Sequence, residues 1–220
     1  MSEPTMNTTS PQNIEAIIFD LGGVLLNLDY HLTGQAFIDL GVTNFNELYT
    51  QFHATKLFEE FEKGQVSERQ FIDELKKHAP VGTTDEQIER AWNAMLLDYP
   101  PGRIGFLKTV GSRYKIYLLS NTNSIHYRAV QKIYTDTVGA GSLDDLFIQS
   151  FYSYTTGMRK PDADIFELVL RETGLRAATT LFIDDTPANI CTAEALGIRS
   201  LFLSKPLRVE ELFQQHGLPG

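Results

Sequence analysis

Five short apolar runs, each followed by a segment of helical character, constrain the fold of this chain more than any other feature. Turn residues bound each run, so each run predicts a buried strand. The runs are residues 16–19, 114–119, 146–151, 180–183 and 198–203. Strands that alternate with helices form parallel sheets with right-handed crossovers. We therefore expect an α/β fold with a doubly wound parallel sheet.

One long segment, residues 31–99, interrupts this alternation. Its apolar side chains recur at helical spacing, and glycine and proline residues such as Gly64 break the pattern into several helices. No strand-like run is evident in it. We expect a core domain made of residues 14–30 and 100–220, with residues 31–99 inserted as an all-helical cap domain.

Charge and composition narrow the class of protein. The net charge is −9, from 28 acidic and 19 basic residues, which argues against a nucleic-acid partner. No run reaches the roughly 18–20 apolar residues that span a bilayer, so no membrane partner is expected.

Residues 1–13 are polar and lack an apolar signal core, so we expect a flexible leader. The single cysteine, Cys191, allows no internal disulfide; we expect it to be buried and the protein to be cytoplasmic.

Chemically capable side chains follow the predicted strands. Asp20 ends the first strand, Ser120-Asn121 follows the second, and Asp184-Asp185 follows the fourth. Lys160 lies in the loop after the third strand. Ligands of parallel sheets bind beyond the carboxyl ends of the strands, which lie at one edge. We therefore expect these groups to form one site.

The charges of this set indicate a metal ion. Asp20, Asp184 and Asp185 would raise one another's pKa if nothing compensated them. Lys160 offsets one negative charge, and a divalent cation would offset two more. Oxygen ligands with few protein carboxylates suit Mg²⁺. The motifs contain no thiol or imidazole ligand, so zinc is not expected.

The same groups suit phosphoryl transfer. A carboxylate can attack phosphorus and form an aspartyl-phosphate, and we assign this nucleophilic role to Asp20. The Ser120 hydroxyl, the Asn121 backbone N–H and the Lys160 ammonium can hold the phosphoryl oxygens. Lys160 also keeps Asp20 ionised. A magnesium ion would neutralise the charge that develops on the phosphoryl group.

Four segments resemble the ordered motifs of the haloacid dehalogenase superfamily. They are Asp20-Leu21-Gly22-Gly23-Val24-Leu25, Leu119-Ser120-Asn121-Thr122-Asn123, Arg159-Lys160-Pro161-Asp162 and Phe182-Ile183-Asp184-Asp185. The helical insertion is similar to the C1 cap of that superfamily, and the resemblance covers nearly the whole chain after residue 14. Within the superfamily, the chain is similar to bacterial phosphatases of small sugar phosphates such as glucose 1-phosphate.

The resemblance implies a Mg²⁺-dependent phosphatase that acts on a small phosphorylated metabolite, as a monomer or a homodimer. It implies that the backbone carbonyl of Gly22 binds the metal, and that Asp184 does so directly or through water. The expected catalytic residues are Asp20, Ser120 and Lys160; the expected phosphate-binding residues are Leu21, Gly22, Ser120, Asn121 and Lys160; the expected metal ligands are Asp20, Gly22, Asp184 and Asp185.

Position 22 departs from the pattern of most phosphatases in this superfamily, which carry a second aspartate there. That residue acts as a general acid and base, which contributes about 10²–10⁴ in rate. Three explanations stay open. One is that the cap supplies His53, Glu59 or Glu62 instead. Another is that the substrate has a good leaving group, such as the anomeric oxygen of a sugar 1-phosphate. The third is that turnover is slow or absent. We favour the second, supported by the first.

Three other functions fit parts of the sequence. A hydrolytic 2-haloacid dehalogenase would use Asp20 without metal, but it has no need of Asp184 and Asp185. A phosphomutase needs acid–base help where the chain has Gly22. Gly22 is the only feature that supports a catalytically weak binding or regulatory protein. Two local alternatives also remain: Asp184 or Asp185 can cap the helix that begins near Pro187, and Arg159 can be a surface or a site residue.

Overall fold

The computed structural model describes residues 13–54 and 56–220, without the side chains of residue 46 and residues 51–54. The expected leader at residues 1–13 therefore lies almost wholly outside the described residues. No helix in the described part of the chain is long and apolar enough to cross a membrane.

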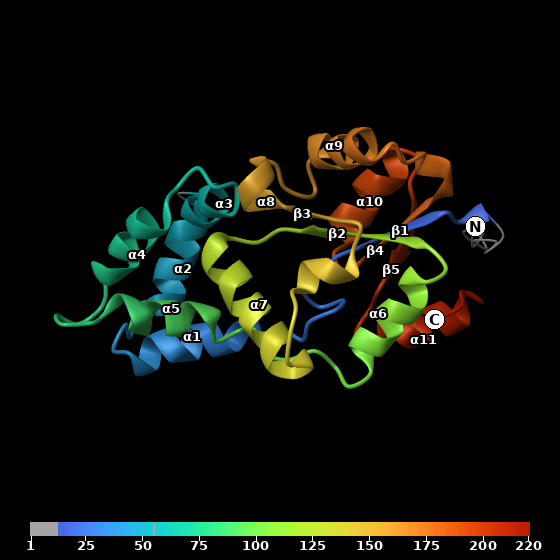
Figure 1. Cartoon of the computed structure of the whole chain (residues 1–220). Helices are drawn as coiled ribbons and strands as arrows, with labels where there is room; N and C mark the ends of the chain where they lie inside the picture. The colour runs from blue at the N-terminus through green and yellow to red at the C-terminus, as the bar shows by residue number, and fades with distance from the viewer. Residues whose placement is uncertain (1–12, 55) are drawn as a thin grey trace, which may run out of the picture.

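The centre of the molecule is the five-stranded parallel sheet that the alternation predicts (Figure 1). Its strands are β1 (Ala16–Phe19), β2 (Lys115–Ser120), β3 (Gln149–Tyr152), β4 (Thr180–Asp184) and β5 (Arg199–Phe202). They lie in the order β3-β2-β1-β4-β5, and every neighbouring pair is parallel. β1 is central, so Asp20 emerges between the ends of β2 and β4.

Alternate side chains of the strands enter two apolar cores, one on each face of the sheet. Ile17 and Phe19 of β1 belong to the core formed with α6 (Arg103–Gly111), α7 (Ser124–Val138) and α11 (Val209–Gln215). Ala16 and Ile18 belong to the core formed with α9 (Ala163–Thr173) and α10 (Pro187–Ala195). Helices on both faces confirm the doubly wound architecture (Figure 1). Short connections complete the α/β part: α8 (Ser153–Thr156), η2 (Leu143–Leu146) and η3 (Ala177–Thr179).

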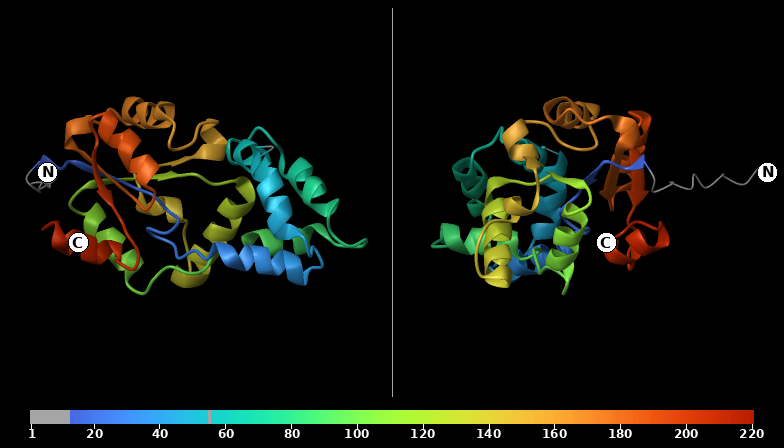
Figure 2. Two further views of the ribbon diagram at one scale, coloured as in Figure 1. Left: turned by 180° about the vertical axis from the view of Figure 1, so that it is seen from behind. Right: turned by 45° about the vertical axis from the view of Figure 1, so that its right-hand side comes forward.

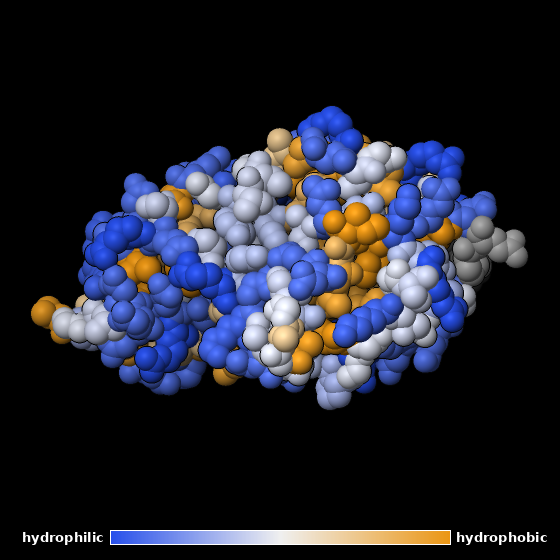
Figure 3. Space-filling view, in the orientation of Figure 1, coloured by the Kyte–Doolittle hydropathy of each residue, from blue (hydrophilic) through white to orange (hydrophobic). Residues whose placement is uncertain are grey.

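The insertion between β1 and α6 consists of helices, as expected. They are α1 (Tyr30–Asp39), α2 (Phe45–Ala54), α3 (Leu57–Glu62), α4 (Glu68–Lys76) and α5 (Asp85–Asn93). These helices surround an apolar core of their own, in which Phe61 stacks on Phe71 with ring centroids 4.1 Å apart. They form a distinct group at one end of the molecule in the left view of Figure 2. Their outward side is largely hydrophilic in Figure 3, as expected of helices that bury one apolar face.

Two chain segments join the helical insertion to the α/β core and lie side by side. Leu28 and Leu96 form an isolated antiparallel bridge. The Asn27 N–H donates to the Asp98 carbonyl at 2.9 Å, and the Asp29 N–H donates to the Met95 carbonyl at 3.0 Å. These bonds fix the insertion beside the turn that follows Asp20.

Two expectations are wrong in detail. The third strand begins at Gln149 rather than at residue 146, because Leu143–Leu146 forms a 3₁₀ turn capped by Ser142, and Tyr117 pairs with Gln149. Cys191 is exposed rather than buried. Ile190 and Ala193 form the buried side of α10, and Cys191 lies between them on the other side.

Candidate active site

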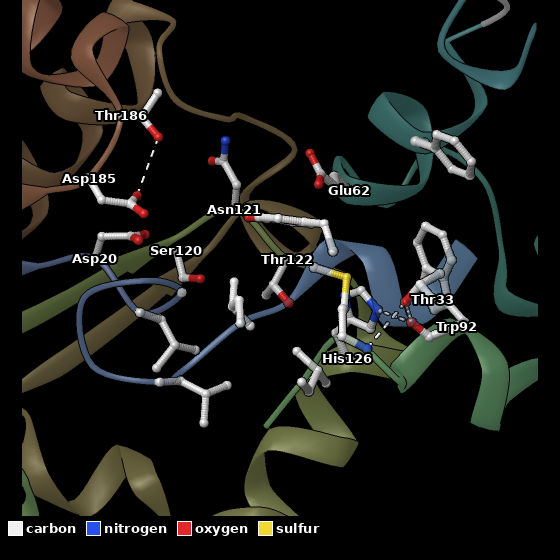
Figure 4. Close-up of a pocket in the computed structure, with 18 of the residues that line it drawn as sticks. Asp20, Thr33, Glu62, Trp92, Ser120, Asn121, Thr122, His126, Asp185 and Thr186 are labelled. Carbon is white, nitrogen blue, oxygen red and sulfur yellow. Dashed lines mark hydrogen bonds between the residues drawn. The ribbon is translucent and has the colours of Figure 1, made fainter. Parts of the chain in front are cut away.

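The structure brings the residues from separate strand ends into one pocket of about 720 Å³. Asp20, Ser120, Lys160 and Asp185 all line it. Figure 4 shows the carboxylates of Asp20 and Asp185 facing each other, with the Ser120 hydroxyl beside them. The helical insertion supplies the opposite side of the pocket, with residues that include Glu62.

Lys160 is fully buried, and its ammonium group makes three hydrogen bonds. It donates to Oδ1 of Asp20 at 2.6 Å, to Oδ2 of Asp184 at 2.7 Å and to the Leu119 carbonyl at 2.9 Å. An ammonium group has three N–H donors, so these contacts use all of them. Lys160 therefore fixes one oxygen of the predicted nucleophile, and its effect on a bound phosphoryl group is mainly that of a nearby positive charge.

Asp184 lies behind the pocket and is completely buried. Besides Lys160, it accepts hydrogen bonds from the Thr186 N–H at 2.8 Å and from the Asn189 side chain at 3.0 Å to each carboxylate oxygen. The helix cap that the sequence left open is not formed by either aspartate, because Thr186 is the N-cap residue of α10 and no side chain caps the helix. These contacts occupy both oxygens of Asp184, so Asp185 is the residue of this pair that lines the pocket.

Burial and mutual repulsion change the acidity of the cluster. Burial, together with the charges of Asp184 and Asp185, raises the pKa of Asp20 to about 7 against the opposing effect of Lys160. Burial and Asp184 also raise the pKa of Asp185. Burial disfavours the charged form of Lys160, but Asp20 and Asp184 outweigh it, so the pKa of Lys160 is raised. With a pKa of about 7, Asp20 is not kept fully ionised by Lys160 alone, contrary to the expectation from the sequence, because burial disfavours its charged form and Asp184 and Asp185 compete for the same ammonium group.

This donor set fits a hard divalent cation. Oxygens of Asp20, Asp184 and Asp185 all lie within 4.8 Å of one another. One ammonium group neutralises one of their three negative charges, and all the donors are carboxylate oxygens, which suit Mg²⁺ better than zinc. Asp20 and Asp185, which line the pocket, are the carboxylates that would bind the ion, and Asp184 would act from behind them.

The turn after Asp20 is packed against this cluster. Gly23 has φ +78°, and a Cβ at this position would lie 2.1 Å from Oδ2 of Asp185. Only glycine therefore lets the backbone pass so close to that carboxylate. A Cβ at Gly22 would lie 2.6 Å from Cδ1 of Leu28. An apolar side chain thus fills the direction in which the missing aspartate would extend.

The residues of the second and third motifs hold each other. The Asn121 side chain donates to the Lys160 carbonyl at 2.8 Å and accepts from the Lys160 N–H at 2.9 Å. Its amide is thus committed to positioning Lys160, and only the backbone of Asn121 is left for a phosphoryl group. Leu21, Gly22 and Ser120 also line the pocket, as the expected phosphate-binding set requires.

The three candidates for a substitute acid in the cap differ in position. The side chain of His53 lies outside the described residues. Glu59 is ion-paired with Lys63 at 2.9 Å and does not line the pocket. Glu62 lines the pocket and is ion-paired with Arg159 at 2.9 Å. Arg159 is thereby a pocket residue, the alternative that the sequence alone left undecided.

Sequence reasoning missed two residues that position the site. Asn189, which holds Asp184, is the third residue of the helix that begins at Pro187, and its place in the first helical turn after Asp184 was an available signal. Arg103 is buried and donates to the Val24 carbonyl in the turn after Asp20. No local pattern identifies Arg103, because Val24 is distant in the chain.

Comparison with known proteins agrees with this geometry. The family model of haloacid dehalogenase-like hydrolases matches residues 14–197. A D-ribitol-5-phosphate phosphatase from Bacteroides thetaiotaomicron is 29% identical over 187 residues, covering 85% of this chain and 90% of the relative. A sesquiterpene phosphatase from Aspergillus oryzae is 27% identical over 197 residues, covering 88% of this chain and 91% of the relative.

Among solved structures, a haloacid dehalogenase family enzyme from Bacteroides thetaiotaomicron, in complex with magnesium and inorganic phosphate, superposes with a TM-score of 0.83. It is 33% identical, and the match covers 91% of this chain and 99% of that one.

Proposed function

The chain belongs to the haloacid dehalogenase-like hydrolases, and from this premise we propose that it is a Mg²⁺-dependent phosphatase of small phosphomonoesters. The observation that carries the proposal is the meeting of Asp20, Lys160 and Asp185 in one pocket from three separate parts of the sheet edge. Relatives named as phosphatases, and the related structure with magnesium and phosphate, support it.

In the first step, a carboxylate oxygen of Asp20 forms a bond to phosphorus while the bond from phosphorus to the leaving oxygen breaks. Lys160 holds Oδ1 of Asp20, which leaves Oδ2 to face the substrate. The products are an aspartyl-phosphate and an alkoxide, which takes a proton from solvent water to become the alcohol. The Ser120 hydroxyl and the backbone N–H of Asn121 support the phosphoryl oxygens.

In the second step, water attacks the phosphorus of the aspartyl-phosphate, and the bond from phosphorus to Asp20 breaks. The attacking water loses a proton to solvent, inorganic phosphate leaves, and the Asp20 carboxylate is restored beside Lys160. A bound Mg²⁺ supplies charge neutralisation for the phosphoryl group in both steps. Asn189 holds Asp184, and Asp184 in turn fixes the position of Lys160 in both steps.

Sugar or polyol phosphates are the substrates that we favour. The relative named for D-ribitol 5-phosphate supports this class. Within this class, Gly22 favours sugar 1-phosphates over primary esters such as ribitol 5-phosphate, because no acidic side chain stands at that position to protonate an alkoxide and Leu28 fills the adjacent space. We also propose that residues 31–99 act as the cap domain over residues 14–30 and 100–220, and that the protein works in the cytoplasm as a monomer or homodimer.

The test is a phosphate-release screen over phosphorylated metabolites, with Mg²⁺ and with EDTA. We expect release only with Mg²⁺, and we expect Asp20→Asn to lower kcat/KM by about 10³-fold or more. Asp185→Asn should weaken the dependence on Mg²⁺, whereas Asp136→Asn, on the exposed side of α7, should change nothing. Release that persists in Asp20→Asn would exclude the mechanism.

The same preparations distinguish the other functions. Chloride release from 2-haloacids without Mg²⁺ would indicate a dehalogenase. Conversion of a sugar phosphate to its isomer, without free phosphate, would indicate a mutase. Binding of phosphate with no turnover of any ester would indicate the catalytically weak binding protein.

A further inference from the structure

An ion pair crosses the pocket boundary between the helical insertion and the α/β core. Glu62, the last residue of α3, meets Arg159, the residue before Lys160, at 2.9 Å between Oε2 and Nη2. Both residues line the pocket, and 29% of the Glu62 side chain and 28% of the Arg159 side chain is exposed to solvent. In Figure 4 the Glu62 carboxylate extends from the ribbon of the insertion toward the core residues.

The backbone fixes this ion pair in place. Gly64, two residues after Glu62, has φ +65°, and a Cβ there would lie 2.4 Å from the Tyr154 carbonyl of α8. The end of α3 therefore rests on the segment that leads to Arg159. On the other side, Lys160 is clamped by Asn121, which fixes the neighbouring Arg159 backbone. These backbone contacts therefore help to position the Glu62 carboxylate and the Arg159 guanidinium, in addition to the ion pair itself.

The pair offers one donor and one acceptor that the described protein does not use. Nε of Arg159 is buried and has no hydrogen-bond partner among the described residues. The ion pair engages only Oε2 of Glu62. A buried donor without a partner costs free energy, which a ligand oxygen at that place would recover.

Two other polar side chains of the pocket wall are already satisfied, whereas Nε1 of Trp92 is, like Nε of Arg159, buried without a partner among the described residues. His126 contacts the Asn123 side chain and the Trp92 carbonyl, both at 3.2 Å. The Thr33 hydroxyl donates to the Trp92 carbonyl and accepts from the Met95 N–H. Much of the remaining wall is apolar, including Leu28, Phe58 and Met95. Glu62 and Arg159 are therefore the charged pair of the insertion-side wall, with Trp92 and Tyr30 as neutral polar residues beside them.

From this arrangement we infer that Glu62 and Arg159 are specificity-determining residues that select a leaving group with hydroxyl substituents. Glu62 accepts a hydrogen bond from one hydroxyl, and Nε of Arg159 donates to an oxygen of the same group, while the apolar wall packs against its carbon chain. A carboxylate at this place also disfavours leaving groups that carry a second anion. This inference rests on the proposed phosphatase activity and deepens it.

The test compares two esters of equal chain length, D-ribitol 5-phosphate and n-pentyl phosphate, with p-nitrophenyl phosphate as a general substrate. We expect the wild type to prefer the ribitol ester by at least about tenfold in kcat/KM. Glu62→Leu and Arg159→Met should each lower kcat/KM for that ester by about 10- to 100-fold, because each removes a hydrogen bond to a charged group. Both variants should lose less on n-pentyl phosphate than on the ribitol ester, so that the preference between the two esters shrinks.

The matched control is Glu59→Leu, which removes a carboxylate from the same helix outside the pocket and should leave the preference unchanged. Thermal unfolding of each variant identifies loss of fold. A wild type that favours n-pentyl phosphate, or that cleaves neither ester, overturns the inference. So does an equal loss on both esters in Glu62→Leu. If the wild type also fails to cleave p-nitrophenyl phosphate in an Asp20-dependent manner, the proposed function itself is wrong.

Discussion

Gly23 is the residue whose replacement most directly tests the geometry of the site. Its backbone is left-handed, with φ +78°, and a Cβ would overlap Oδ2 of Asp185 at 2.1 Å. We expect Gly23→Ala to displace that carboxylate and to weaken Mg²⁺ affinity at least about tenfold. We also expect a loss of about 1–2 kcal/mol in the free energy of unfolding from the strained backbone. Calorimetric titration with Mg²⁺ and urea unfolding measure the two effects.

Gly82→Ala is the matched control for this substitution. Gly82 has φ +93°, but a Cβ there has nothing within 4 Å. It should show a similar loss of stability with unchanged Mg²⁺ affinity. Equal Mg²⁺ affinities in the wild type and in both variants would contradict the assigned role of Asp185.

Gly22 tests how the enzyme manages without a second aspartate. Because a Cβ at this position meets Leu28 at 2.6 Å, Gly22→Asp is best combined with Leu28→Ala. We expect the double variant to raise turnover of alkyl phosphates, whose leaving oxygen needs a proton, by about tenfold or more. Turnover of sugar 1-phosphates should stay within about threefold, since the anomeric oxygen needs less help.

The single variant Leu28→Ala separates the effect of the added carboxylate from that of the added space. Equal gains on alkyl phosphates and sugar 1-phosphates would argue against the leaving-group explanation. Steady-state kinetics on both esters, at saturating Mg²⁺, give the comparison.

At the level of elements, Arg103 connects α6, α11 and the turn after Asp20. It is buried at the start of α6, donates to Glu210 of α11 at 2.8 and 3.1 Å, and donates to the Val24 carbonyl in the turn after Asp20. Burial alone would raise the pKa of Glu210, but Arg103 outweighs it and lowers that pKa. These contacts therefore link α6 and α11 of the core to the turn that lies against Asp185.

We expect Arg103→Met to lower the free energy of unfolding by about 2–3 kcal/mol, because it leaves Glu210 and the Val24 carbonyl without a donor. Arg103→Met with Glu210→Met should recover part of the stability but not the activity, since the Val24 turn stays unsupported. Urea unfolding and kcat measure these effects. Arg176→Met, which removes an exposed pair with Glu15, should cost less than about 1 kcal/mol. Full recovery of kcat in the double variant would contradict the role of the turn.

The strands show how closely the apolar pattern of the sequence predicts strand boundaries. β1 and β4 match their apolar runs to within one residue, because both are buried on both faces and flanked by turns. The predicted start of β3 was wrong. Leu146, Phe147 and Ile148 have strand composition, but they precede Gln149, the first residue of β3, which pairs with Tyr117 of β2. Strand pairing, not composition, determines where an edge strand begins.

At the scale of the whole molecule, His126 of α7 joins the core to the insertion. Its ring stacks on Trp92 of α5 with centroids 5.0 Å apart. Oδ1 of Asn123 accepts from the His126 N–H at 2.9 Å, so the Asn123 amide nitrogen faces Nδ1 of the ring. Nδ1 must then accept, and Nε2 donates to the Trp92 carbonyl. The neutral ring is satisfied, whereas a second proton on Nδ1 would face a donor.

Burial therefore lowers the pKa of His126 from 6.5 to about 4, and this gives stability a pH dependence. Between these values the unfolded chain binds the proton and the folded chain does not, so stability is present above pH 6.5 and falls as pH drops toward 4. We expect this histidine to account for up to about 3 kcal/mol of the loss. His126→Gln keeps one donor and one acceptor without titrating, so its urea-unfolding free energy should fall less over this range. Parallel curves for the two proteins would refute the assignment.

The sequence by itself determined the parallel sheet, the helical insertion and the gathering of Asp20, Ser120, Lys160 and Asp185. These follow from local periodicity and from the rule that parallel strands end at one edge. Only the tertiary structure decided that Asp184 is saturated behind the site, that Leu28 occupies the direction of a side chain at position 22, and that Glu62 meets Arg159. Those contacts join residues far apart in the chain, and their distances depend on how the insertion packs on the core, which no local pattern encodes.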